Sequence, residues 1–452
     1  MGGSQVKKEK KEISVYFANW NLDRLPAEQA GEVVGIPWDC VTNIKHAFWQ
    51  VAPADGSTET SFERRDHGDA PRTAFTIQSM WQKYDMEDQT PSAIDPSLPR
   101  NHFAQYAVFA KRYPDVEIML SIGGWARCGY FSEMAYTREG RRSFIQSCID
   151  FLKKHAWASG IDIDWEYPGC SIAGERLPDL SDPDHDEGCP IWGTAKEDAD
   201  HFTALMAEMR EAMDATFGKG VKKLTACCAG STTTILPLQD WAAVAPYMDR
   251  INIMSYDMSG VWDGVTGHHT SFSDTKKVVD YFAGLGIDVG KLCIGTPFYA
   301  LAFKMKEMNP MQVVGAPCET YRASSGIVTE RDLEEFEAQA SSGYRLEKDG
   351  ARWQKDRDFD DGGKGWHLVY DKEAGAAYAY NDEEDSNYYK WFLTYEDHWT
   401  LQKKLDYIHD AGVGGIIIWE VDQDTQDYAF MNQIANNLLS CIDYKNETKY
   451  IR

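Results

Sequence analysis

Eight short runs of β-branched and apolar residues recur along the chain, and most are followed by a pattern of helical period. This alternation is typical of β/α units that build a parallel sheet. Eight parallel strands are the number that closes a barrel, and such barrels can run past about 400 residues. The sequence therefore predicts an α/β fold, a (β/α)8 TIM barrel. The expected strands are 13–20, 41–51, 116–124, 160–168, 223–230, 250–258, 291–299 and 414–420.

Helices are expected between these strands. Thr194 followed by Glu197 predicts a capping box at the start of one of them. Thr137 precedes an apolar stripe at helical spacing, and similar stripes occupy 274–285, 395–411 and 427–439.

Two intervals are too long to be simple connections. The first is 52–99, after the second strand, and the second is 300–387, between the seventh and eighth strands. The second holds extended runs at 366–370 and 376–380 and a helical piece at 331–337, so it predicts a small α+β insertion. The expected organisation is a disordered leader at 1–12, a barrel formed by 13–299 and 388–452, and an insertion domain at 300–387.

The fourth run carries three acids at alternate positions. Asp162, Asp164 and Glu166 share one face of the expected strand, and apolar residues share the other. Successive carboxylates lie about 6.6 Å apart along a strand. Like charges this close cannot all ionise, so the ladder indicates a cavity that holds a proton among acids.

This run resembles the active-site motif of family 18 glycoside hydrolases, the chitinase family. The family pattern is Asp-x-x-Asp-x-Asp-x-Glu, and this chain reads Ser159-Gly-Ile-Asp162-Ile-Asp164-Trp-Glu166. Only the first acid differs, since Ser159 replaces it. That acid lies deep in the family's barrel and supports the others.

The resemblance implies substrate-assisted hydrolysis with retention of configuration, an exception to the usual pair of catalytic carboxylates. Glu166 is then the general acid, and Asp164 orients the acetamide and stabilises positive charge. Asp162 shares a proton with Asp164, while Tyr256 and Asp257 hold the acetamide from the other side.

The ends of other strands match the same family. The third ends Ser121-Ile-Gly-Gly124-Trp125, whose glycines allow close backbone approach, and the sixth ends Met254-Ser-Tyr256-Asp257. After the seventh strand, Tyr299-Ala-Leu301 replaces the usual Tyr-Gly-Arg, so the arginine contact to sugar is absent or supplied from elsewhere. The expected substrate-binding residues are Tyr16, Trp20, Phe48, Gly124, Trp125, Met254, Trp262, Tyr299 and Trp419.

The net charge of the chain indicates which classes of partner it can bind. The 71 acidic and 46 basic residues give a formal charge of -25, which argues against nucleic acid or an anionic membrane. A neutral polysaccharide is indifferent to that charge. No stretch of about 20 apolar residues suits a membrane span. We expect a monomer that binds chitin or N-acetylglucosamine oligosaccharides, with no cofactor and no metal.

Further expectations concern where the protein acts and how its cysteines pair. The polar start lacks the apolar core of a signal peptide, but an insoluble polymer as substrate favours an extracellular enzyme. Cys170 and Cys189 bracket a polar loop and are expected to form a disulfide, with two free thiols as the alternative. The adjacent Cys227 and Cys228 should face opposite ways as buried thiols.

Three functions fit these residues. The first is a chitinase that cleaves β-1,4 links between N-acetylglucosamine units. The second, an endo-β-N-acetylglucosaminidase acting on N-glycans, would use the same acids, although the insertion and the aromatic residues favour chitin. The third is a chitin-binding lectin of the same fold, which typically lacks the acid that Glu166 supplies here.

Overall fold

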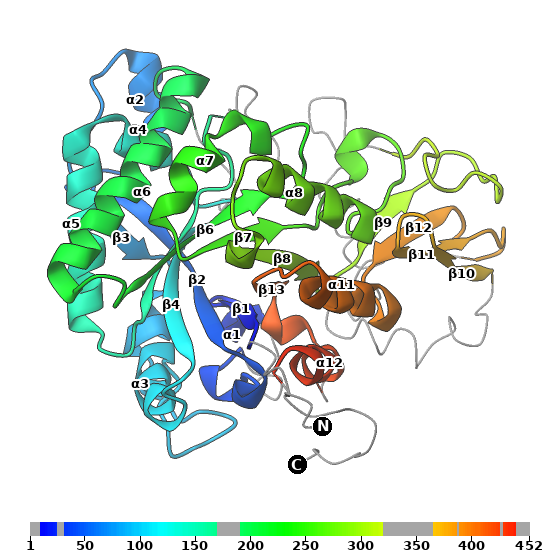
Figure 1. Cartoon of the computed structure of the whole chain (residues 1–452), viewed down its shortest axis with the longest axis horizontal. Helices are drawn as coiled ribbons and strands as arrows, with labels where there is room; N and C mark the ends of the chain where they lie inside the picture. Colours follow the sequence, from blue (N-terminus) through cyan, green and yellow to red (C-terminus); the bar gives the residue numbers. More distant parts are fainter. Residues whose placement is uncertain are drawn as a thin grey trace, which may run out of the picture.

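The computed structural model describes residues 10–24, 31–169, 190–319, 365–386, 388–424 and 428–439. Within these ranges, eight parallel strands close a barrel in the order β1-β13-β8-β7-β6-β5-β4-β2, and β2 pairs back to β1 (Figure 1). The expected (β/α)8 barrel is confirmed. Its strands are β1 (Glu12–Ala18), β2 (Asn43–Pro53), β4 (Glu117–Gly123), β5 (Gly160–Asp164), β6 (Lys223–Ala229), β7 (Arg250–Met254), β8 (Leu292–Pro297) and β13 (Gly415–Trp419).

Helices pack around the outside of the barrel (Figure 1). The predicted capping box is present, because Thr194 and Glu197 each bond the other's backbone at the start of α6. Thr137 likewise caps α5 by accepting from Gly140 N. The longer helices are α3 (His102–Arg112), α5 (Arg138–Lys154), α6 (Ala195–Phe217), α8 (Phe272–Gly284), α11 (His398–Asp410) and α12 (Ala429–Leu438). Shorter ones are α1 (Asn21–Arg24), α2 (Ser61–His67), α4 (Phe131–Tyr136) and α7 (Trp241–Val244).

The two faces of β5 differ as the sequence predicts. Ile161, Ile163 and Trp165 are buried in the core between barrel and helices, where the Trp165 ring lies 5.3 Å from that of Phe131. Asp162 hydrogen bonds with side chains of four other barrel strands. The apolar face therefore fixes the strand against its helices and directs the acids into the barrel.

Two strands end well before the expected residue. β5 stops at Asp164 and β7 at Met254, four residues before each predicted end. The last pair between β5 and β6 joins Ile163 and Ala226, so the alternating pattern continues past the hydrogen-bonded ladder. Glu166, Tyr256 and Asp257 consequently lie in loops at the carboxyl ends of the strands, where barrel enzymes carry their active sites.

The interval after β8 forms a second, antiparallel sheet of order β10-β11-β12-β9. Its strands are β9 (Leu301–Lys304), β10 (Trp366–Asp371), β11 (Ala376–Asn381) and β12 (Trp391–Tyr395). In Figure 1 this sheet lies to one side of the barrel, beside α11 and α8. β12 belongs to this sheet although it lies beyond the boundary expected at 387, in the range that the sequence assigned to the barrel, and it is followed by α11. The expected helical piece at 331–337 lies outside the described residues.

A buried ion pair joins this sheet to the barrel. Lys404 on α11 bonds Glu396, which follows β12, and donates to Gly295 O on β8 over 2.9 Å. Thr296 on β8 also donates to Glu396, over 3.0 Å. Both ionic groups are almost fully buried, and breaking such a pair leaves an uncompensated charge. The contact therefore couples the small sheet to the barrel.

Three further expectations concern the leader, the cysteines and membrane-spanning segments. β1 begins at Glu12, the last residue of the expected leader, and residues 1–9 lie outside the described ranges. Cys170 and Cys189 also lie outside them, so their pairing stays a prediction. Within the described part of the chain, no helix combines the length and apolar character needed to cross a membrane.

Candidate active site

Asp162 lies inside the barrel with both carboxylate oxygens fully engaged. Tyr16 and Ser121 donate to Oδ2 over 3.0 and 2.8 Å. Thr225 and Asn252 donate to Oδ1, the latter over 3.0 Å. A carboxylate offers about four lone-pair positions, so these four donors use its acceptor capacity. A proton shared directly with Asp164 would have to displace one of them.

Asp164 is the next acid along β5 and is also buried. Burial raises the pKa of its carboxyl group to about 8, and the negative charge of Asp162 adds to this rise. A hydrogen bond from Cys227 and the charge of Lys45 oppose the shift. Its Oδ1 is buried without a hydrogen-bond partner in the described structure. That atom is therefore available to a donor brought by a ligand.

Glu166 follows the end of β5. Burial raises the pKa of its carboxyl group well above the ordinary value, and the charges of Asp164 and Asp257 raise it further. A hydrogen bond with the backbone of Trp125 opposes the shift. A glutamate in this setting keeps its proton near neutral pH, as a general acid must.

Two glycines at the end of β4 bring the backbone close to the acids. A Cβ on Gly123 would lie 2.1 Å from Asp164 O, and a Cβ on Gly124 would lie 2.6 Å from the Phe48 ring. Their φ values of 119° and 86° also favour glycine. The close approach expected from the glycine pair is thus present, and Gly124 N donates to Asp164 O over 2.8 Å.

Most of the predicted aromatic residues meet in one cluster at the carboxyl ends of the strands. The Phe48 and Trp419 rings stack with centroids 5.4 Å apart, and Trp20 lies 6.1 Å from each. The Tyr16 ring is 5.7 Å from Trp419. The same cluster includes Met254, Tyr256, Tyr299 and Cys227. Residues from both ends of the sequence thus form one apolar floor beside the acids.

Trp125 and Trp262 lie outside this cluster and are exposed by 43% and 48%. Tyr167 donates to Trp125 O over 2.7 Å and packs edge-on against the Trp125 ring. Large exposed aromatic rings are available for stacking against a ligand.

Tyr256 and Asp257 follow β7 and approach the acids from the side of that strand. Tyr256 is buried, and its pKa is raised by burial and by the charges of Cys227 and Asp164, in that order. Asp257 is about half exposed and has a left-handed φ of 54°. His269, a fully buried residue that the sequence analysis did not select, lies with Nδ1 3.5 Å from Asp257 Oδ1.

The two departures from the family pattern have structural roles here. Ser159 Oγ accepts from Ile118 N over 3.2 Å, so this side chain joins the starts of β4 and β5. Leu301 begins β9 and pairs with Thr394 of β12. Neither position supplies a charge to the acids.

Sequence analysis missed three residues that surround the acids, namely Thr225, Cys227 and Asn252. The alternation of side chains along a strand could have indicated them, because Thr225 and Cys227 share a face of β6 and Asn252 shares a face of β7 with Met254. Cys227 Sγ lies 2.8 Å from Tyr16 Oη, while Cys228 faces the outer core. The opposite orientation predicted for the two cysteines is confirmed, and both thiols are free.

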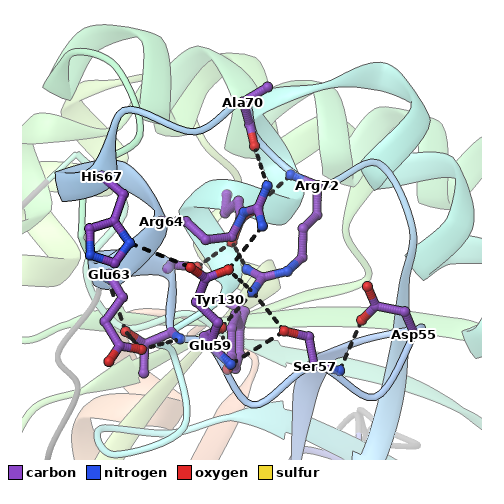
Figure 2. Close-up of polar contacts among 12 residues, drawn as sticks. Asp55, Ser57, Glu59, Glu63, Arg64, His67, Ala70, Arg72 and Tyr130 are labelled. Carbon is purple, nitrogen blue, oxygen red and sulfur yellow. Dashed lines mark hydrogen bonds and ion pairs between the residues drawn. The ribbon is translucent and has the colours of Figure 1, made fainter.

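The loop after β2 is tied to α4 by a network of charged residues (Figure 2). Arg72 bonds the fully buried Glu133 over 2.8 Å and also donates to Glu59 O. Arg64 pairs with Glu59 over 2.9 Å and lies 3.7 Å from Glu133. Tyr130 donates to Glu59 O over 3.4 Å, so the loop is fixed on the side of the barrel that carries the acids.

Among the residues that the structure describes, two groups of three side chains have ligand atoms close enough for a metal, namely His46, Asp85 and His102, and Glu59, His67 and Asp69. In the buried group, His46 and His102 lie 2.9 and 3.2 Å from Asp85 Oδ1. Trp49 and Asn19 donate to Oδ2 of the same carboxylate. Protein donors already satisfy Asp85, so we assign the buried group a structural role at the ends of β1 and β2.

Comparisons with known proteins agree with this geometry. Chitinase A of Pseudoalteromonas piscicida is 26% identical over 92% of this chain and 50% of its own length. The chain spans about half the length of the curated relatives it matches. The solved Group IV chitinase of Ostrinia furnacalis in complex with allosamidin has a TM-score of 0.65 at 21% identity, covering 95% of this chain and 98% of that one.

A family 18 N-acetylglucosaminidase from Paenibacillus barengoltzii has the same fold, with a TM-score of 0.61 at 21% identity over 95% of this chain and all of that one. The model of the family described as glycosyl hydrolases family 18 matches residues 12–424. This match covers nearly the whole chain, from the first barrel strand to just beyond the last. The chain therefore belongs to glycosyl hydrolases family 18.

Proposed function

We propose that this protein is a chitinase that hydrolyses β-1,4 links between N-acetylglucosamine units with retention of configuration. The observation that carries the proposal is the environment of Glu166, whose raised pKa makes it a proton donor near neutral pH. It stands beside an aromatic floor suited to a sugar ring. Such a pair of features fits hydrolysis better than binding alone, which argues against the lectin alternative.

The reaction begins when Glu166 donates its proton to the glycosidic oxygen and the bond from that oxygen to the anomeric carbon breaks. The carbonyl oxygen of the substrate's acetamide attacks the same carbon and forms a bicyclic oxazolinium ion. Water then adds to the anomeric carbon from the opposite side and opens that ring. The proton that water loses returns to Glu166, so the enzyme is regenerated and the configuration is retained.

Asp164 acts on the acetamide. Its Oδ1 lacks a partner in the described structure and suits the acetamide N–H, and its ionised form, which is populated as the pH rises through the pKa of about 8, stabilises the oxazolinium. Asp162, held by its four donors, fixes the inner end of the run of acids next to Asp164. Tyr256 and Asp257 hold the acetamide from the side of β7.

The sugar rings contact the predicted binding residues. Tyr16, Phe48 and Trp419 floor the subsite next to the cleaved bond, with Trp20 at its edge. Trp125 and Trp262 supply exposed stacking faces farther along the chain of sugars. The small sheet and the loop anchored by Glu133 flank the site, and a walled site of this kind should release mainly disaccharide. We further propose that the protein acts as an extracellular monomer.

The test is initial-rate hydrolysis of N-acetylglucosamine oligomers beside a high-mannose glycopeptide. Cleavage of the oligomers alone supports a chitinase, and cleavage of the glycopeptide alone would make the protein an endo-β-N-acetylglucosaminidase. Binding without cleavage of either would favour a lectin. An oligomer whose acetamides are replaced by hydroxyls should be nearly inert, and proton magnetic resonance of the fresh product should show the retained anomer. Inversion, or comparable cleavage of the hydroxyl analogue, would refute substrate assistance.

A further inference from the structure

The turn that follows Glu166 lies beyond the hydrogen-bonded part of the barrel. The ladder between β5 and β4 ends at Asp164, and the ladder between β5 and β6 ends at Ile163. Other contacts must therefore fix the backbone around Glu166. Such support matters, because a catalytic group has to stay within about 0.5 Å of its productive position.

The two residues directly after Glu166 each have an anchor. Tyr167 donates to Trp125 O, just after β4, over 2.7 Å. Gln239 lies in the connection between β6 and α7, is 6% exposed, and donates to Pro168 O. The first part of the turn is thus fixed by contacts with two other connections at the carboxyl ends of the strands.

The next residue of the turn is bound to a buried carboxylate. Gly169 N donates to Oδ2 of Asp198, in the first turn of α6, over 2.9 Å. The Gly169 φ of 77° favours glycine, and a Cβ there would lie 2.8 Å from Ala195 O. The turn therefore lies directly against the start of α6.

The other oxygen of Asp198 binds a second point of the same connection. Ser132 on α4 donates to Oδ1 over 2.6 Å and accepts from Trp192 N over 2.7 Å. Asp198 is 1% exposed and Ser132 is fully buried. One carboxylate consequently holds the connection between β5 and α6 twice, directly at Gly169 and through Ser132 at Trp192.

Only a carboxylate suits both of these donors. An asparagine would offer one acceptor and two N–H donors, so one of the two contacts would be lost. Burial raises the pKa of Asp198 to about 6, and hydrogen bonds from Ser132 and Gly169 oppose that rise. Among the residues that the structure describes, no charged group adds to these bonds. A buried charge without a cation destabilises the folded state at neutral pH, so packing alone does not account for this residue.

We propose that Asp198 and Gln239 are positioning residues that fix the turn after Glu166. By holding Gly169 and Pro168, they keep the Glu166 carboxyl group where it meets the glycosidic oxygen. The inference rests on the proposed function, since it takes Glu166 as the general acid.

The experiment compares Asp198→Asn with Asp200→Asn in the full chain. Asp198→Asn should lower kcat on N-acetylglucosamine oligomers about ten- to a hundredfold, because a small misplacement of a catalytic group has an effect of this size. Calorimetry should show that the binding of oligomers is retained. Asp200 lies on the same helix, is exposed and pairs with Lys196, so its variant should keep full activity.

The pH dependence of stability separates positioning from packing. Because its pKa is raised from 3.8 to about 6, Asp198 contributes stability at low pH that is lost as the pH rises through about 6. Asp198→Asn should therefore gain in melting temperature relative to the wild type between about pH 4 and pH 6, with a constant difference above that range. A merely structural role predicts a lower melting temperature and an unchanged kcat of the folded protein.

Gln239→Met tests the same turn without changing a charge, and it does so even if Asp198→Asn does not fold. The variant keeps the length of the side chain but removes the donor to Pro168 O. A loosened turn admits water to Glu166 and lowers its pKa. We therefore expect kcat to fall and the alkaline limb of the pH profile to move to lower pH.

Two results would overturn the inference. One is a folded Asp198→Asn variant whose kcat equals that of Asp200→Asn. The other is a Gln239→Met variant whose kcat and alkaline limb both coincide with those of the wild type.

Hydrogen exchange followed by mass spectrometry does not need turnover. The peptide that contains Gly169 should exchange faster in Asp198→Asn than in Asp200→Asn, and equal exchange would contradict the contact. If the wild-type protein cleaves no oligomer but the exchange rates differ, the proposed function fails while the anchoring of the turn stands.

Discussion

Replacing Glu166 by glutamine removes the transferable proton while keeping the shape of the side chain. A glutamate at its ordinary pKa of about 4.3 holds a proton in roughly one molecule in 500 at pH 7. Burial and the charges of Asp164 and Asp257 raise the pKa of Glu166 well above that value, so a much larger fraction of molecules carries the proton. The glutamine variant has no such proton in any molecule.

We therefore expect Glu166→Gln to lower kcat by about 10²- to 10⁴-fold, the contribution of a general acid. This corresponds to about 3 to 5 kcal/mol of lost transition-state stabilisation. Binding of oligomers, measured by calorimetry, should survive, since the variant keeps its hydrogen-bonding reach. Glu211→Gln on the exposed face of α6 is the matched control and should retain full activity.

The pH profile of the wild-type enzyme provides an independent check. A raised pKa means that the protonated, active form of Glu166 persists into neutral solution and is lost as the pH rises through that pKa. Two outcomes would refute the reasoning. They are an alkaline limb near the ordinary glutamate value, or a glutamine variant that keeps more than about a tenth of wild-type kcat.

Two further perturbations follow from described contacts. Asp164→Asn removes a negative charge that helps to raise the pKa of Glu166, so kcat should fall and the alkaline limb of the pH profile should move to lower pH. Rates measured across a range of pH test this prediction, and an alkaline limb that does not move would contradict it. Arg72→Met removes the 2.8 Å ion pair of the fully buried Glu133 and leaves only Arg64, 3.7 Å away, so it should cost about 3 kcal/mol in urea unfolding. The control, Arg64→Met, removes a side chain that is 24% exposed and should cost less than about 1 kcal/mol, whereas equal losses would contradict the assigned roles.

The barrel was predictable because each strand carries its own signal. β-branched runs and period-two alternation identify strands without knowledge of their neighbours, and the three acids of β5 were readable in the same way. The residues at which the strands end were less predictable. Glu166 continues the alternation of Asp162 and Asp164, although the ladder to β6 has already finished at Ile163.

The partners of the acids could not be predicted, because they depend on how neighbouring strands align. Asn252 lies between two isoleucines of β7, and its bond to Asp162 spans 90 positions. The register of β6 against β5 and β7 brings Thr225 and Asn252 to the same oxygen. Likewise, Arg72 and Glu133 are 61 positions apart, so composition alone revealed only that the loop after β2 is long and polar.

The pairing of β1 with β13 has a consequence for how the chain folds. Glu12 aligns with Gly415, so the first barrel strand obtains its second neighbour only after the chain has been synthesised as far as β13. Until then, β1 and β8 each present an open edge, and unpaired edges of this kind attract other chains. A nascent or truncated chain lacking β13 should therefore aggregate more readily than the complete barrel. It would also lack Trp419, so the aromatic floor and the closed barrel should form in the same late step.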